Sequence, residues 1–347
     1  MKKMKAIVKT KEGPGNVELM EMPVPEVKEN EVKIKVDCAG ICGTDVKIKH
    51  GDTWSNPPVI LGHEFSGVVE EVGRLVTSVK PGDRVVSETA QIICGHCEYC
   101  NTANQLMCPE RLSIGYGTHG AFANYCVVRE AIVHKIPEGV SMEEAALAEP
   151  SAVAAHAVMD SVHLEPTDLV IVMGPGTIGL LVSQIVKSYG CEVVITGTDV
   201  DEARLEVAKE LGMDHIVNVQ KQDLVEFMDA LTAGRGADVV FDCTGVLPAI
   251  RSGMSALKKK GKFVQIGLTK QNLEIEYGLL PQREISLIGT FGHNWKAWEN
   301  ILKMISQGKL KTKPLITHTF GIDDWEKAFE IAEKCQGIKI LIKPNEK

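Results

Sequence analysis

Four cysteines within fifteen residues constrain this chain more than any other feature of its sequence. Residues 94–108 read C-G-H-C-E-Y-C-N-T-A-N-Q-L-M-C, with two, two and seven residues between successive cysteines. Four thiolates so close together can converge on one tetrahedral Zn²⁺ and leave no coordination position open. We therefore expect a structural zinc site, the alternatives being a pair of disulfides or four unrelated thiols. Its ligands would be Cys94, Cys97, Cys100 and Cys108.

Composition indicates a globular protein of two domains. The chain has 347 residues, of which 44% are hydrophobic and 24% charged, and its net charge is -8 without a basic cluster. Nucleic acid is therefore not an expected partner. The N-terminus lacks the apolar core of a signal peptide, and the longest apolar run, residues 169–186, is interrupted by glycines and polar residues. Ten cysteines, four at metal spacing, favour a reducing, cytoplasmic location without a membrane.

The pattern of apolar residues changes along the chain. Short alternating runs between residues 4 and 86, separated by Gly/Pro turns, predict an irregular β-rich lobe. Ser141, with Glu144 three residues later, predicts a capping box at the start of an alanine-rich helix, with a break at Pro150. From about residue 167, strands alternate with helices, which predicts a doubly wound parallel sheet in an α/β fold. The tail from about residue 294 is expected to return to the first lobe.

A glycine-rich turn follows the first strand of the predicted sheet. Residues 174–179 read G-P-G-T-I-G. Gly174 would permit the tight turn, Gly176 the approach of a pyrophosphate, and Gly179 close packing of helix on strand. The amides of Thr177 and Ile178 begin the helix that faces the phosphates. A mere tight turn is the alternative, but the flanking elements favour a dinucleotide.

An acidic residue after the second strand of the sheet bears on the choice between NAD and NADP. Asp199 lies where a carboxylate accepts hydrogen bonds from the adenosine ribose of NAD. If Gly197 or Thr198 ends the strand instead, room is left for a 2′-phosphate with Arg204 nearby. We expect NAD, with NADP possible.

Two further segments suggest a second metal site. Cys42 lies in G-I-C-G-T-D, and His63 and Glu64 lie in G-H-E. A thiolate, an imidazole and a carboxylate form a mixed set suited to a catalytic zinc that keeps one position open. Taken singly, Cys42 is more often a buried thiol and His63 a satisfied turn histidine.

Together these motifs resemble the zinc-containing medium-chain alcohol and polyol dehydrogenases, and the resemblance covers nearly the whole chain. It implies a GroES-like catalytic domain at residues 1–155, with a structural-zinc lobe at about residues 92–110, completed by residues 294–347. It also implies a Rossmann domain at residues 156–293, with the active site between the two. Members of the family commonly pair across a sheet edge, so we expect a homodimer or homotetramer.

The resemblance also implies roles for individual residues. Cys42 and His63 would be catalytic zinc ligands. Glu149 stands where many alcohol dehydrogenases have a second cysteine, as in the sorbitol and threonine dehydrogenase branches, and Glu64 or Glu149 would complete the shell directly or through water. Thr44 would begin a proton relay. The family often has a histidine where this chain has Lys47, so the outer member of the relay is Lys47 or His50.

The activity expected from the resemblance is zinc-dependent transfer of a hydride from a secondary hydroxyl of a polyol to NAD(P)⁺, which gives a ketose. Sorbitol or L-iditol 2-dehydrogenases are the most similar branch. Gly292 and His293 replace the Arg-Tyr pair of the animal sorbitol dehydrogenases, so sorbitol itself is doubtful as the substrate. Residues that could line the substrate pocket are Trp54, Phe291, His293 and Trp295. The alternatives are an L-threonine 3-dehydrogenase-like enzyme and a non-catalytic dinucleotide-binding zinc protein.

Overall fold

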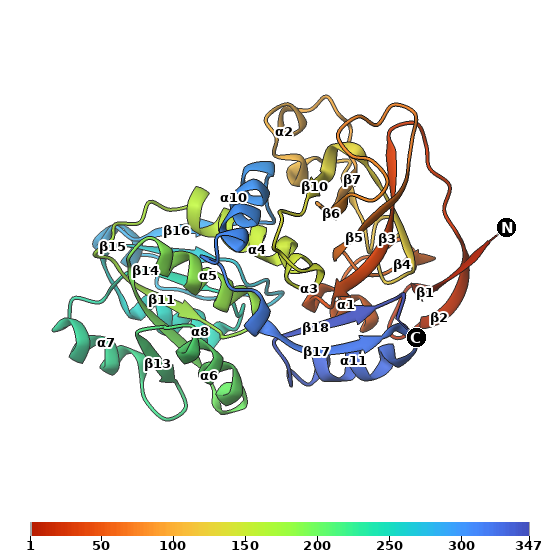
Figure 1. Cartoon of the computed structure of the whole chain (residues 1–347). Coiled ribbons are helices and arrows are strands. Elements are labelled where there is room, and N and C mark those ends of the chain that lie inside the picture. Colours follow the sequence, from red (N-terminus) through yellow and green to blue (C-terminus); the bar gives the residue numbers. More distant parts are fainter. Residues whose placement is uncertain (1, 347) are drawn as a thin grey trace. The chain divides into compact units, whose positions relative to one another are not determined.

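The computed structural model describes residues 2–346, which form two compact units (Figure 1). The first unit contains the chain up to Glu149, the segment His293–Gly308 and the segment that begins at Thr312. The second contains Pro150–Gly292 and Lys309–Lys311. None of the helices within residues 2–346 combines the length and the apolar character needed to cross a membrane.

The first unit is built mainly of antiparallel strands. In β3, the side chains of Val32, Ile34 and Val36 alternate with lysines and are fully buried, as expected for a strand with one face on a core. A small sheet has the order β2 (Val17–Pro23), β1 (Lys3–Lys9), β4 (Val59–Ile60). The large sheet has the order β10 (Val133–Lys135), β6 (Arg84–Ser87), β5 (Glu64–Val72), β3 (Glu31–Gly40), β18 (Lys339–Lys343), β17 (Ile316–Gly321), and β9 (Tyr125–Arg129) also pairs with β3.

Short helices and a hairpin complete this unit. The hairpin of β7 (Ala90–Ile92) and β8 (Leu112–Ser113) flanks the cysteine-rich segment, which contains α2 (Glu98–Asn101) and the 3-10 turn η1 (Gln105–Met107). Three longer helices are α1 (Gly43–Lys49), α10 (Trp295–Ser306) and α11 (Trp325–Glu333), and α11 packs on β17 and β18. The remaining turns are η2 (Glu130–Ile132), η5 (Lys313–Leu315) and η6 (Ile322–Asp324).

The predicted capping box is present at the start of α3 (Met142–Ala145). The Ser141 hydroxyl accepts a hydrogen bond from the Glu144 amide at 3.2 Å, and the Glu144 carboxylate accepts one from the Ser141 amide at 3.1 Å. The expected break at Pro150 was wrong. The helix breaks earlier, and α4 spans Ala148–Ala155 with Pro150 in its first turn. A proline is tolerated there because amides of the first turn need no intrahelical acceptor.

The second unit is the doubly wound parallel sheet that the sequence predicted. Its strands lie in the order β13-β12-β11-β14-β15-β16. Successive strands are added toward one edge up to β13 and toward the other edge from β14 on, so the chain order changes sense between the adjacent, parallel strands β11 and β14 (Figure 1). The strands are β11 (Leu169–Met173), β12 (Glu192–Gly197), β13 (His215–Asn218), β14 (Ala237–Asp242), β15 (Leu257–Gln265) and β16 (Ser286–Gly289). The helical elements are η3 (His156–Asp160), α5 (Thr177–Ser188), η4 (Asp199–Asp201), α6 (Glu202–Glu210), α7 (Leu224–Thr232), α8 (Leu247–Ser255) and α9 (Leu279–Arg283). In such sheets ligands bind at the carboxyl ends of the strands where the order reverses.

Candidate active site

The four clustered cysteines come together in the first unit. Their sulfur atoms lie within 4.8 Å of one another, with 3.9 Å between Cys94 and Cys100 and 3.5 Å between Cys97 and Cys100. A tetrahedral zinc with Zn–S bonds of about 2.3 Å would separate its sulfur ligands by about 3.8 Å. The sulfurs are too far apart for disulfides, which need about 2.05 Å. The geometry therefore fits one zinc ion.

The surroundings of the cysteines also favour a cation. Backbone amides donate to two of the sulfurs, from Cys97 to Cys94 and from Cys94 to Cys108, each at 3.3 Å. The backbone amide of His96 is the main cause that lowers the pKa of Cys94 to about 6, whereas desolvation raises the pKa of Cys100 to about 12. The metal-free cluster therefore holds thiolate and thiol together, and a bound metal would release the remaining protons.

Cys42, His63 and Glu64 also converge, although twenty residues separate the first two. One ligand atom from each lies within 4.8 Å of the others, and His63 and Glu64 are buried. Cys42 immediately precedes α1, and Glu64 is the first residue of β5. Soft sulfur, imidazole nitrogen and carboxylate oxygen are the donor types of catalytic zinc sites, so the set fits that ion.

Asp45 fixes both segments that carry these ligands, and the sequence reasoning missed its role. Its fully buried carboxylate accepts hydrogen bonds from the Cys42 amide at 2.9 Å and the Gly62 amide at 3.3 Å, and lies 3.6 Å from Nδ1 of His63. Burial alone would lower the pKa of His63, but the charges of Asp45 and Cys42 raise it well above its usual value. A carboxylate behind a ligating histidine orients the ring and increases its basicity.

Lys339 is a second residue that the sequence did not reveal. Its Nζ lies 2.5 Å from Oε2 of Glu64 and donates to the carbonyl of Ile41 at 3.1 Å, and both charged side chains are almost completely buried. Burial alone would lower the pKa of Lys339, but Glu64 and Cys42 raise it. A buried cation thus balances part of the negative charge around the candidate metal site.

Glu149 lies outside the group of ligand atoms formed by Cys42, His63 and Glu64. It occupies the first turn of α4, and its Oε1 is 3.7 Å from Nε2 of His293. Burial is the main cause that raises the pKa of Glu149 to about 7, and the negative charge of Glu64 acts in the same direction. In the metal-free protein this carboxyl is therefore partly protonated near neutral pH.

The glycine-rich turn of the second unit has the geometry that the sequence predicted. Gly174 has φ +94°, and a Cβ on Gly179 would lie 1.8 Å from the carbonyl oxygen of Gly174. A Cβ on Gly176 would meet no heavy atom of the described residues within 4 Å, so this backbone face is open. Thr177 and Ile178 begin α5 directly after it. The turn therefore fits a pyrophosphate at a helix N-terminus.

The two residues that bear on cofactor choice lie beyond the end of β12. The exposed carboxylate of Asp199 accepts a hydrogen bond from Asn218 at 2.7 Å, with Lys221 at 3.6 Å. Arg204 donates to Asp201 at 3.0 Å, and its side chain is largely buried. Gly197 is the last residue of β12, and this is the strand end that was expected to leave room for the 2′-phosphate of NADP.

The remaining predicted residues lie at separate places. Thr44 is in the first turn of α1, with Lys47 exposed one turn later, and Nε2 of the exposed His50 lies 3.3 Å from Glu333. The three aromatic side chains proposed for a substrate pocket are exposed, whereas His293 is buried. These three are Trp54, Phe291 and Trp295.

Comparisons with known proteins agree with these features. The model of the zinc-binding dehydrogenases matches residues 177–307, and that of the alcohol dehydrogenase GroES-like domain matches residues 28–138. A sorbitol dehydrogenase of Halalkalibacterium halodurans is 40% identical, over 98% of this chain and 99% of its own. A D-arabitol-phosphate dehydrogenase of Enterococcus avium is 39% identical, over 99% and 98% of the two chains.

Two further similarities concern substrate and cofactor. An L-threonine 3-dehydrogenase of Bacillus subtilis is 36% identical over 99% of both chains. The crystal structure of a putative zinc-binding dehydrogenase from Sinorhizobium meliloti bound to NADP superposes with a TM-score of 0.92 at 28% identity, covering 99% of this chain and 100% of that one.

Proposed function

Because this chain belongs to the zinc-binding medium-chain alcohol and polyol dehydrogenases, we propose that it oxidises a secondary hydroxyl of a polyol to a ketone. It is an NAD(P)-linked alcohol dehydrogenase, which excludes the alternative of a non-catalytic dinucleotide-binding zinc protein. The assignment to a sorbitol- or L-iditol 2-dehydrogenase-like reaction that yields a ketose is supported by the two polyol-type relatives, which are 40% and 39% identical against 36% for the threonine dehydrogenase. The donor set of one thiolate, Cys42, with His63 and Glu64 is expected in both branches and is compatible with a polyol. A metal with one thiolate receives less charge and remains a harder Lewis acid, which suits a polyhydroxy ligand.

Residues of the first unit have two roles in this reaction, metal binding and proton transfer. Cys42 and His63 hold the metal, which when bound supplies a Lewis acid that lowers the pKa of the substrate hydroxyl. Glu64 lies closer to these ligands than Glu149 does, but its Oε2 is paired with Lys339, so we assign the third protein position to Glu149. Thr44 would begin the proton relay: its hydroxyl accepts the proton of the substrate hydroxyl as its own proton moves on toward Lys47 or His50.

We assign NAD as the preferred cofactor. Asp199 presents an exposed carboxylate beyond the end of β12, where it would accept hydrogen bonds from ribose hydroxyls and repel a 2′-phosphate. Arg204 is engaged by Asp201, which leaves it less suited to a phosphate. NADP remains the alternative. β12 ends at Gly197, the strand end expected to leave room for a 2′-phosphate, and a similar structure is bound to NADP.

Two zinc ions per chain and a homo-oligomer complete the proposal. The four-cysteine cluster would hold the structural ion and Cys42, His63 and Glu149 the catalytic one. In the second unit, β16 ends the sheet and pairs only with β15 among the described strands. Leu287 on this strand and Phe291 beyond it are exposed, and an apolar sheet edge of this kind needs cover. A homodimer or homotetramer would supply that cover.

The alternative substrate is L-threonine, as the name of one relative suggests. Threonine would need partners for its ammonium and its carboxylate, whereas a polyol needs neither. A polyol phosphate is a third possibility that the name of the Enterococcus relative raises.

The test is reduction of NAD⁺ and NADP⁺ by zinc-replete protein with sorbitol, xylitol, D-arabitol, D-arabitol phosphate, 2,3-butanediol and L-threonine, each with and without a chelator. We expect chelator-sensitive turnover on a polyol, with NAD⁺ preferred. Turnover on L-threonine alone would replace the polyol assignment with the threonine one. Turnover that survives complete removal of zinc would refute the proposed chemistry.

A further inference from the structure

His293 approaches Glu149 from a distant part of the chain. It lies just before α10, where Asn294 caps the helix by accepting a hydrogen bond from the Ala297 amide at 2.9 Å. Its side chain is completely buried, and its Nε2 lies 3.7 Å from Oε1 of Glu149. A side chain so enclosed is poorly placed to line an open pocket, in contrast to the role that the sequence suggested for it.

Trp298 determines which nitrogen of His293 carries the proton. The indole Nε1 lies 2.9 Å from Nδ1 of His293, and an indole nitrogen can only donate. Nδ1 must therefore accept, and the neutral ring carries its proton on Nε2, the atom that faces Glu149. A proton on Nδ1 would oppose the indole N–H at the same contact. Trp298 thus selects the tautomer that can donate toward the carboxylate.

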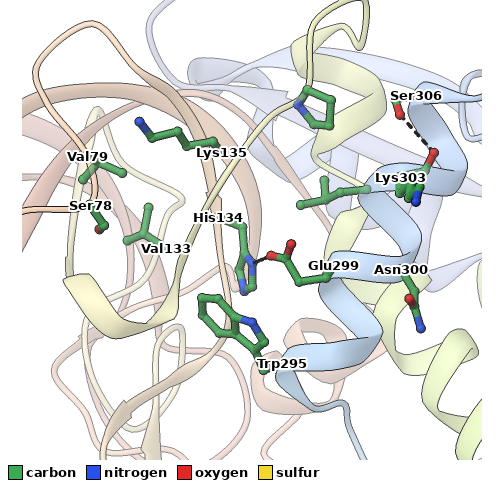
Figure 2. Close-up of a pocket in the computed structure, with 12 residues that line it drawn as sticks. Ser78, Val79, Val133, His134, Lys135, Trp295, Glu299, Asn300, Lys303 and Ser306 are labelled. Carbon is green, nitrogen blue, oxygen red and sulfur yellow. Dashed lines mark hydrogen bonds and ion pairs between the residues drawn. The ribbon is translucent and has the colours of Figure 1, made fainter.

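The buried side chain of His134, with its neighbours, packs against the indole. His134 stacks on Trp298 with ring centroids 5.2 Å apart and planes 8° from parallel, and lies 4.1 Å from the ring of Trp295. Its Nε2 contacts Glu88 at 3.1 Å and its Nδ1 contacts Glu299 at 2.8 Å. Figure 2 shows His134 beside Trp295 and directed at Glu299, in the wall of a cavity of about 580 Å³. His134 and its neighbours therefore pack against the face of the indole, whereas His293 accepts from its N–H edge, and Glu88 also lies 3.7 Å from Nδ1 of His293.

We propose that His293 is a positioning residue for Glu149: in the tautomer that Trp298 selects, Nε2–H faces the carboxylate at 3.7 Å, longer than a direct hydrogen bond, and holds its direction electrostatically. The inference rests on the proposed function, since Glu149 is the carboxylate assigned to the catalytic metal. Outer-shell donors to metal-ligating carboxylates set their direction, and their loss lowers metal affinity by about 10- to 100-fold. His293 then serves the metal site without contacting the substrate.

The test uses metal binding, which does not depend on knowing the substrate. In His293→Asn the amide is too short to reach Glu149, whereas the amide nitrogen of His293→Gln lies near the position of Nε2. We expect His293→Asn to weaken zinc at the catalytic site by about tenfold or more in competition with a chelator. We also expect it to change the visible spectrum of the Co²⁺-substituted protein, and His293→Gln to restore both readouts. Trp298→Phe, which removes the N–H that selects the tautomer together with part of the buried ring, should shift affinity in the same direction.

A matched control is His215→Gln in the second unit, because Nε2 of His215 also contacts a glutamate, Glu192, at 2.7 Å. It should leave affinity and spectrum unchanged. In a Glu149→Ala background, His293→Asn should have no further effect on zinc affinity. Wild-type metal affinity in His293→Asn, or an undiminished effect in the Glu149→Ala background, would overturn the proposal. A raised KM for the substrate with unchanged zinc affinity would also overturn it, because His293 would then contact the substrate. Failure of the polyol assay alone would affect only the proposed substrate.

Discussion

Replacement of Lys339 by methionine tests the buried ion pair beside the candidate metal site. The side chains of Lys339 and Glu64 are 3% and 2% exposed, and 2.5 Å separates the charged atoms. Removal of one member of such a pair leaves a buried charge without a partner, which costs about 3–5 kcal/mol. For a domain of this size, 1 kcal/mol corresponds to about 2–4 °C in Tm, so the expected loss is roughly 6–20 °C.

The assay is differential scanning calorimetry of zinc-replete protein, with two comparisons. The double variant Glu64→Gln, Lys339→Met removes both charges and should recover much of the loss, because the isolated charge causes the damage. Lys3→Met breaks an exposed pair with Glu21, in which both side chains are 65% exposed, and should give no resolvable change in Tm. A loss in Lys339→Met as small as that of Lys3→Met, or a double variant no better than the single one, would refute the reasoning.

Three further predictions concern the metals and the cofactor. Because the pKa of Glu149 is raised to about 7, zinc must displace a proton from this carboxyl below that pH. Zinc affinity at the catalytic site should therefore fall as the pH is lowered from about 8 to about 6. In Glu149→Gln the pH dependence of zinc affinity should correspond to about one proton fewer released on binding. Chelator competition would measure this, and equal slopes would contradict it. Cys100→Ser should reduce bound zinc from about two ions per chain to about one by elemental analysis, and an unchanged content would exclude a role for Cys100. Asp199→Ser should lower kcat/KM for NAD⁺ about tenfold and that for NADP⁺ far less, and equal losses would show that Asp199 does not select the cofactor.

The features that the sequence predicted are those in which a few neighbouring residues determine the geometry. The glycines at 174 and 179 are required by the path of a single turn, and the spacing of four cysteines confines their sulfurs to one small volume. Ser141 and Glu144 likewise form a cap that their own backbone positions decide. Each of these patterns can be read without knowing what packs against it.

The residues that sequence reasoning missed depend on pairings between distant segments. Lys339 reaches Glu64, 275 positions away in the sequence, because β18 pairs with β3 in the register Leu341 to Gly40. The charged residues Lys339 and Glu64 would predict a buried ion pair only if the pairing of β18 with β3 were already known. His293 illustrates the same limit, because the sequence left pocket lining and plain packing equally open, and only the fold shows its side chain enclosed beside Trp298.

The position of β18 after the whole second unit in the sequence has a consequence for biosynthesis. β18 lies between β3 and β17 in the large sheet, and its first residue is Lys339. A growing polypeptide therefore completes all six parallel strands of the second unit before this strand leaves the ribosome. Until then β3 lacks one of its partners, and Glu64 and Glu149 lack their buried cation. A strand translated after the whole second unit thus supplies both a partner of β3 and the countercharge beside the candidate metal site.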